Sequence, residues 1–555
     1  MESTPKSSII LESTPKSSII LESTPKSSII LESTPKSKKM KNKEPSNFNN
    51  SDNDPGGQPS DFSDPISMPE VDNMEFFRTP AMLNKNSKAW HEKEIPIRIN
   101  SYNRPEGIEI NIESKLINEH NLMKYPNGIW QNYPEDNKAK LLDNIAYIFT
   151  AHLPMLLKGN IRLEYNTGYP QCFSWSQQSF MRHLPLYWYY YKKRGMSVMP
   201  MLKTLLNSRA YFRDTTDVPP EFPISVDENV ILPFTFGKDS FLTYHVCKEL
   251  KLNTILVFFN DPTFLGYEGA HKKVLFEEFL KKNKNDLYFL ENPMEGLRDN
   301  GDGWFGWELS LTSWALMCLP LAYKYKAGYI LFSNEKSVNA FYYDDQGFKV
   351  VPEYEQAYQA TEEMSLLTQA MSEGELYTST FLQGLNDLAI VAVLNENYAK
   401  ETFPYLMSCW DGSEEKRWCG KCTKCARLYL YLSAMGINPI EVAGFEDDMF
   451  SEDKIDLYNA FGEKASGLGW DSFGLNKDEQ ELSFYICAKL GNQAPLVQIF
   501  KNSEAYQRVE QNLNVLVDEY LGLHEEHSSP LIWRTQINEI FNTALKKVRE
   551  RVFSL

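Results

Sequence analysis

Residues 229–250 read NVILPFTFGKDSFLTYHVCKEL, and this stretch decides the fold that we expect. The apolar run at 230–234 predicts a buried strand, residues 235–240 predict a tight turn, and a helix is expected from Phe241. Such a turn directs successive backbone N–H groups, two hydroxyl groups and the positive end of the helix dipole to one point, where an anion binds. Lys238 adds a positive charge there. The stretch therefore predicts a phosphate-binding loop.

The loop differs from the Walker pattern, in which two glycines with four residues between them are followed by Lys and Ser or Thr. It resembles instead the PP-loop of the ATP pyrophosphatases, Ser-Gly-Gly-x-Asp-Ser. The residues in register with that pattern are Thr235, Phe236, Gly237, Lys238, Asp239 and Ser240. Phe236 stands in place of the first glycine, which would let the backbone approach a ligand without a Cβ in the way. An ordinary strand-to-helix turn with a serine cap is the alternative interpretation of these six residues.

A second motif lies in CWDGSEEKRWCGKCTKC, residues 409–425, which holds four of the eight cysteines: Cys409, Cys419, Cys422 and Cys425. Four thiolates in so short a span can close a tetrahedral zinc site with no open position, so the predicted role is structural. Zinc is favoured over an iron–sulfur cluster because no other cofactor signature accompanies the cysteines, although the spacing alone allows both. Disulfides are disfavoured, since the sequence shows no secretory signal and the other cysteines are scattered.

Together the two motifs resemble the 7-cyano-7-deazaguanine synthase family, in which a PP-loop is followed late in the chain by a four-cysteine run and an arginine. Here the run ends at Cys425-Ala-Arg427, with one residue where the family has two before the arginine. The resemblance covers roughly residues 226–436. It implies an α/β domain of the adenine-nucleotide alpha hydrolase type, a parallel sheet with a four-cysteine zinc site.

The rest of the chain divides into three further regions. Residues 1–75 begin with a ten-residue repeat, Glu-Ser-Thr-Pro-Lys-Ser-Ser-Ile-Ile-Leu, that is too short and polar to bury a core, and we expect a disordered tail. Residues 86–225 predict an α+β accessory domain that opens with a hairpin of the runs 95–99 and 108–112, the first confined to a sheet edge by Pro96. Residues 437–555 predict a helical region, with helices at 479–490, 504–520 and 533–552.

Composition limits the possible functions. The chain has 555 residues and a net charge of −17, which argues against general nucleic-acid binding. Its apolar runs are shorter than the eighteen or so residues that cross a bilayer, so no membrane association is expected. Because no targeting signal is evident, we expect a cytoplasmic protein.

Strands and helices alternate after residue 226, and ligands of open parallel sheets bind beyond the carboxyl ends of the strands. Asp261 follows the predicted strand 254–260, and Asn334 and Glu335 follow the predicted strand 328–333. In the family, the nucleotide lies between the PP-loop and the end of the second strand, and the loop after the later strand faces the acyl substrate. A solvated loop carboxylate is the equally weighted alternative for Glu335.

The resemblance implies an ATP-dependent ligase that activates a 7-deazaguanine-type carboxylate as an acyl-adenylate, releases pyrophosphate and passes the acyl group to an amine. Thr235, Gly237 and Ser240 would bind the pyrophosphate, Lys238 the phosphate charge, and Asp239 magnesium or the loop itself. Lys238, Asp239 and Ser240 are the predicted catalytic residues, and residues 235–240 with Asp261 the predicted ATP site.

Two family segments are missing, a Tyr-Pro-Asp-Cys-Arg run and an Arg-Asn pair before a buried helix, which predicts a remodelled acyl pocket. We therefore expect the amine of a partner protein, as in relatives encoded in antiviral defence systems. The alternatives are an ordinary nitrile-forming synthase that uses ammonia, and a nucleotide-binding scaffold without turnover.

Overall fold

The computed structural model describes residues 94–555 apart from 127, 158–159, 194–198, 214–219, 262–266, 299–304, 345, 410, 463–474 and 526–527. The chain divides into two compact units, Met1–Arg78 and Thr79–Leu555, and every described residue belongs to the second. The repeat tail expected at 1–75 lies outside the described residues.

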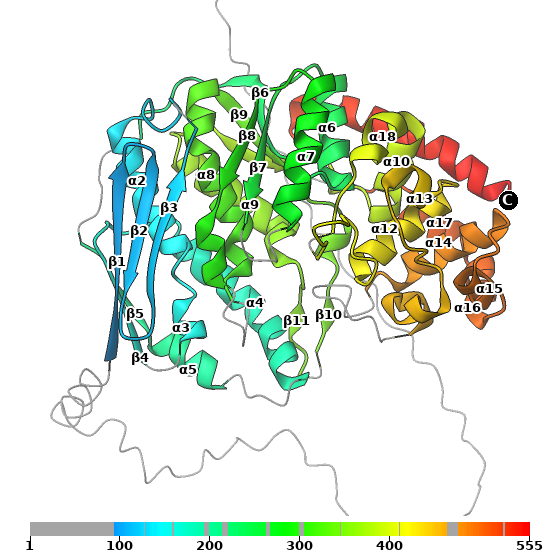
Figure 1. The fold of residues 1–555 in the computed structure, drawn as a ribbon, viewed down its shortest axis with the longest axis horizontal. Coiled ribbons are helices and arrows are strands. Elements are labelled where there is room, and N and C mark those ends of the chain that lie inside the picture. Colours follow the sequence, from blue (N-terminus) through cyan, green and yellow to red (C-terminus); the bar gives the residue numbers. More distant parts are fainter. Residues whose placement is uncertain are drawn as a thin grey trace, which may run out of the picture. The chain divides into compact units, whose positions relative to one another are not determined.

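A five-stranded sheet lies at the centre of the second unit, and all of its strand pairs are parallel (Figure 1). Its strands, in the spatial order β12-β9-β6-β7-β8, are Tyr377–Thr380, Ala327–Phe332, Val226–Pro233, Asn253–Asn260 and Leu287–Glu291. The chain enters at β6, adds β7 and β8 on one side, and then crosses to add β9 and β12 on the other. This order places a topological switch point between β6 and β9, where open α/β sheets form ligand-binding crevices.

Side chains of β6 alternate between two apolar cores, because successive residues of a strand point to opposite faces. Val230 and Leu232 enter one core together with helices α6 (Lys238–Glu249) and α7 (Tyr267–Lys282). Ile231 enters the other core, which α8 (Ser310–Tyr325) and α9 (Tyr358–Ala370) share. The sheet is therefore covered on both faces, as a parallel sheet with crossover helices requires. The expected α/β architecture is confirmed at this level.

A second five-stranded sheet precedes the central one, in the order β3-β2-β1-β4-β5. Its strands in chain order are Glu94–Arg104, Gly107–Glu113, Asn118–Lys124, Asn160–Tyr165 and Arg209–Tyr211. The helices beside it are α2 (Glu135–Ile148), α3 (Leu153–Leu156), α4 (Phe173–Lys193) and α5 (Met199–Asn207). This region shares the α8 core, and the Tyr125 hydroxyl donates to the carbonyl of Met317 at 3.1 Å.

The hairpin expected in this region is confirmed, since β1 and β2 pair antiparallel and are joined by a turn between Arg104 and Gly107. The expectation that Pro96 confines its strand to the sheet edge is wrong, because β1 lies between β2 and β4. Pro96 is paired only with Arg162 of β4, and the pairing with β2 begins two residues later, at Arg98. At the proline itself the strand has one neighbour, so a residue without an N–H is tolerated.

The chain after β12 is helical. Its helices are α10 (Asp387–Asn397), α11 (Ala399–Thr402), α12 (Thr423–Ala434), α13 (Pro439–Ala443), α14 (Lys477–Lys489), α15 (Pro495–Lys501), α16 (Glu504–Gln511), α17 (Leu513–Tyr520) and α18 (Leu531–Phe553). The single helix expected at 504–520 is two helices separated by Asn512. Within the described residues, no helix is both long enough and apolar enough to cross a bilayer.

Short elements complete the described fold. They are the strands β10 (Tyr342–Tyr343) and β11 (Lys349–Val350), and the 3₁₀ turns η2 (Pro293–Arg298), η3 (Trp307–Leu309), η4 (Ser337–Asn339), η5 (Tyr354–Gln356), η6 (Phe403–Tyr405), η7 (Glu452–Leu457) and η8 (Asn459–Phe461).

Candidate active site

The loop between β6 and α6 lies at the carboxyl end of the central strand. Helix α6 begins at Lys238 with Gly237 as its cap, three residues before the expected start. The Ser240 hydroxyl donates to the carbonyl of Gly237 at 3.1 Å and accepts from the backbone N–H of Thr235 at 3.3 Å. These bonds fold the loop over the first turn of α6, so the hydroxyls of Thr235 and Ser240 lie together, 3.4 Å apart.

Phe236, which replaces the first glycine of the PP-loop pattern, keeps the backbone conformation that glycine favours. Its φ is 59°, in the left-handed region that costs a bulky residue free energy. Its ring is fully buried and packs against other aromatic rings, with centroids 4.8 Å from Phe234 and 5.8 Å from Phe241. The ring contacts stabilise the residue in this conformation, and the side chain lies in the core beneath the loop.

A buried group of charges lies directly beside the loop. The Lys238 ammonium is 2.5 Å from a carboxylate oxygen of Asp239 and 2.5 Å from one of Asp387. The other oxygen of Asp387 is 3.2 Å from Nε of Arg427. One oxygen from each of Asp239, Glu335 and Asp387 lies within 4.8 Å of the others, as carboxylates around one cation would.

These five residues come from four loops and helices at one edge of the sheet. Lys238 and Asp239 begin α6, Glu335 follows β9, Asp387 begins α10 and Arg427 belongs to α12. Asp387 is fully buried and Glu335 nearly so, whereas 31% of the Asp239 side chain is exposed. Asp239 therefore lies on the open side of the group, where a ligand from solvent would arrive.

This group places three carboxyl groups against two cations, so ionisation of all three would leave a net negative charge inside the protein. Burial raises the pKa of Glu335 well above its usual value, and the negative charge of Asp387 raises it further. Burial also raises the pKa of Asp239. Although burial opposes it, the charges of Lys238 and Arg427 hold the pKa of Asp387 below its usual value. A bound divalent cation would favour the ionised form of these carboxyl groups, and the oxygen donors suit magnesium.

Two further predicted site residues, Asn334 and Asp261, make contacts outside this group of charges. The side-chain amide of Asn334 donates to the hydroxyl of Thr361 at 3.1 Å, and the backbone carbonyl of Asn334 accepts from the hydroxyl of Thr380 at 2.8 Å. These bonds tie the end of β9 to α9 and β12. Asp261 follows β7, and its pKa is raised well above the usual value by burial and by the neighbouring Glu295.

Asp261 belongs to a second buried polar group, formed at the ends of β7 and β8. Arg298 is fully buried, and its Nη1 donates to Glu295 at 3.0 Å and to the Ser310 hydroxyl at 2.7 Å. The Asn292 amide donates to the other oxygen of Glu295 at 3.3 Å. Within the described residues, Nε and Nη2 of Arg298 and one oxygen each of Asn292 and Asp261 have no hydrogen-bond partner. Buried groups of this kind are costly unless a ligand or water satisfies them.

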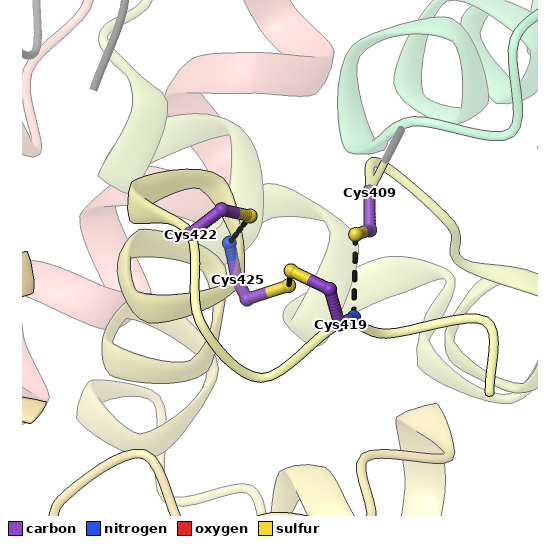
Figure 2. A group of neighbouring side chains, drawn as sticks. All are labelled: Cys409, Cys419, Cys422 and Cys425. Carbon is purple, nitrogen blue, oxygen red and sulfur yellow. Dashed lines mark hydrogen bonds between the residues drawn. The ribbon is translucent and has the colours of Figure 1, made fainter. Parts of the chain in front are cut away.

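The four predicted metal-binding cysteines converge at the start of α12, as Figure 2 shows. Their sulfur atoms lie within 4.8 Å of one another, and those of Cys419 and Cys425 are 3.8 Å apart. A tetrahedron with zinc–sulfur bonds of about 2.3 Å has edges of about 3.8 Å. Backbone N–H groups donate to the sulfurs of Cys409 and Cys422 at 3.3 and 3.4 Å. All eight cysteines are free thiols, so the geometry and the donor set fit a four-thiolate metal site.

Gly420 shapes the turn that presents these sulfurs. Its φ is +66°, and a Cβ on it would lie 2.2 Å from a carboxylate oxygen of Asp447. A side chain at this position would strain the backbone and displace Asp447, so the Cys-Gly-Lys-Cys turn requires glycine.

Sequence reasoning missed Asp387 in the first polar group, and Asn292, Glu295 and Arg298 in the second. The available signal for Asp387 was its place after a serine- and threonine-rich strand and just inside a helix start, where an acidic residue is favoured. Compared with protein-family models and with curated proteins, the chain matches none.

Proposed function

We propose that this protein is an ATP-dependent ligase that forms AMP and pyrophosphate. One observation carries the proposal: a PP-loop-like turn lies at the switch point of a parallel sheet, beside a buried lysine, two buried carboxyl groups and the half-buried carboxyl group of Asp239. A P-loop would instead cradle the phosphates with its two glycines and transfer the terminal phosphate.

Each residue of the loop and of the charged group would have its own role in binding ATP. Backbone N–H groups of the loop, with the hydroxyls of Thr235 and Ser240, bind the β- and γ-phosphates, and Lys238 neutralises part of their charge. Asp239 and Glu335 would hold magnesium, which when bound stabilises the charge that develops on the departing pyrophosphate. Asp387 holds Lys238 in place.

The chemistry takes place in two steps. A carboxylate oxygen of the substrate attacks the α-phosphorus, a new O–P bond forms, and the bond to the β-phosphate oxygen breaks to release pyrophosphate. An amine then attacks the acyl carbon, AMP leaves, and the amine loses its proton. The loop and its charges act in the first step by electrostatic stabilisation and by alignment.

For the acyl substrate we propose a 7-deazaguanine-type carboxylate, following the family resemblance, and for the acceptor an amine of a partner protein in an antiviral defence system. The second polar group supports a polar planar substrate, because in the described part of the chain Arg298 has donors, and Asn292 and Asp261 have acceptors, without a hydrogen-bond partner. Ordinary nitrile synthesis with ammonia is the alternative acceptor chemistry. A scaffold that binds nucleotide without turnover is the alternative class.

Product analysis tests the proposal. ATP labelled at the α-phosphate is incubated with magnesium and 7-carboxy-7-deazaguanine, with and without a partner protein encoded nearby. We expect labelled AMP together with unlabelled pyrophosphate, which is measured separately. Asp239→Ala or Ser240→Ala should lower both by about tenfold or more, and Asp453→Ala, an exposed control, should leave both yields unchanged.

Three outcomes discriminate between the alternatives. ADP as the main product would overturn the class of enzyme. Complete conversion to the nitrile with ammonia and no partner would overturn the protein acceptor, which otherwise shows an added acyl mass by mass spectrometry. Nucleotide binding without any product would favour the scaffold.

A further inference from the structure

The four-cysteine site and the phosphate-binding loop are joined by a short backbone contact. Met407 and Ser408 immediately precede Cys409. The backbone N–H of Met407 donates to the carbonyl of Phe236 at 2.9 Å, in the middle of the loop. The segment that supplies the first cysteine therefore also holds the loop.

A chain of charges makes a second connection. Cys425 lies in the first turn of α12, and Arg427 follows two residues later on the same helix. Arg427 contacts one oxygen of Asp387 at 3.2 Å, and the other oxygen of Asp387 contacts Lys238 at 2.5 Å. The side chains of Arg427, Asp387 and Lys238 are 14%, 0% and 9% exposed. Because little water reaches these ion pairs, each charge strongly restrains the position of its neighbour.

Glu479 of α14 is hydrogen-bonded to residues close to Asp387 and Arg427. One of its oxygens accepts from the backbone N–H of Leu388 at 2.8 Å, and the other accepts from the Tyr431 hydroxyl at 3.1 Å. Leu388 adjoins Asp387, and Tyr431 lies one turn beyond Arg427 on α12. The carboxylate thus links the start of α10 to the helix that carries the cysteines.

We propose that Arg427 and Asp387 are positioning residues that set the place of Lys238, so that metal binding by the four cysteines is coupled to nucleotide binding at the loop. Loss of the metal would free the start of α12, and with it Arg427, Asp387 and Lys238 in turn. The inference rests on the proposed function, because it needs the loop to bind ATP. It goes beyond that function by giving the four-cysteine site an effect on the reaction centre.

Calorimetric binding of a non-hydrolysable ATP analogue to zinc-loaded protein tests the connection. We expect Arg427→Ala to weaken binding about tenfold, Asp387→Asn to do the same, and Arg427→Lys to recover part of the loss. Lys424→Ala, which removes an exposed charge from the same helix, should stay within about twofold of the wild type. Zinc content and melting temperature of each variant show whether it is folded.

A linkage measurement separates positioning from a merely structural role. If the two sites are coupled, nucleotide must raise zinc affinity by the same factor by which zinc raises nucleotide affinity. Transfer of zinc to a chromophoric chelator should therefore be several-fold less favourable for the wild type when the analogue is present. Arg427→Ala should abolish that difference.

The possible failures are distinguishable. A wild type that does not bind the analogue would overturn the proposed function and, with it, the coupling. A wild type that binds the analogue while zinc transfer to the chelator is unaffected would overturn the coupling alone. This second result needs no variant, so it decides the matter even if Arg427→Ala does not fold.

Discussion

Glu308 titrates inside the protein, and replacing it by glutamine should change how stability depends on pH. The side chain is 1% exposed, and burial raises its pKa from 4.5 to about 7 even though the Tyr187 hydroxyl donates to it at 2.5 Å. A carboxyl group whose pKa is raised on folding favours the folded state below its unfolded pKa, and this contribution is lost as pH rises through the folded pKa. With about 1.4 kcal/mol for each pKa unit, the wild type should lose about 2–3 kcal/mol from this group between pH 5 and pH 8.

Urea denaturation of both proteins at several pH values measures this effect. The difference in unfolding free energy between Glu308→Gln and the wild type should move by about 2–3 kcal/mol in favour of the variant from pH 5 to pH 8. Packing changes cancel in this comparison, because they contribute equally at both pH values. Glu441→Gln, at an exposed position, serves as the matched control and should show no such movement. Parallel pH profiles for Glu308→Gln and the wild type would refute the reasoning.

Three further predictions concern the loop, the cysteines and the second polar group. Phe236→Gly should lower the free energy of unfolding by about 2–4 kcal/mol in urea, since the lost ring contacts outweigh the relieved backbone strain; an unchanged midpoint would contradict this packing. Purified protein should carry about one equivalent of zinc by elemental analysis, and Cys422→Ser should lose it together with thermal stability; stoichiometric iron would contradict the assignment. Arg298→Met should cost about 3–5 kcal/mol of unfolding free energy by leaving Glu295 charged and unpaired, and adding Glu295→Gln should recover most of it; a single variant as stable as the wild type would contradict the buried pair.

The parts of the fold that the sequence predicted are those with local signals. The strand 230–234 and the turn after it each span only a few residues, and the four cysteines lie within residues 409–425. The structure brings the four cysteine sulfurs together, as their spacing predicted. Alternating strands and helices were enough to predict a parallel sheet. The helix break at Asn512 and the central place of β1 were missed, because both depend on what packs against the segment rather than on its own composition.

The residues that complete the candidate site carried little or no local signal. An isolated aspartate at a helix start, such as Asp387, is ordinarily a capping charge, and an isolated glutamate in a helix, such as Glu479, is ordinarily solvated. Asp387 is buried next to Lys238 and Arg427 because the chain crosses over to add β9 beside β6 and β12 beside β9, just before α10 begins. Glu479 is buried against the same region by the packing of α14. Only the tertiary arrangement shows that these carboxylates face cations.

The helical region after residue 436 takes part in this arrangement through Glu479. Without its carboxylate, the N–H of Leu388 and the hydroxyl of Tyr431 would lose their acceptor inside the core, next to Asp387. Burial and the charge of Asp387 together raise the pKa of Glu479 to about 8, so a negative charge on Glu479 is costly there. A buried acid in an unfavourable environment persists only where the surrounding structure requires its hydrogen bonds. The C-terminal helices are therefore part of the framework that positions the charges around Lys238, and removing them should expose and disorder that group.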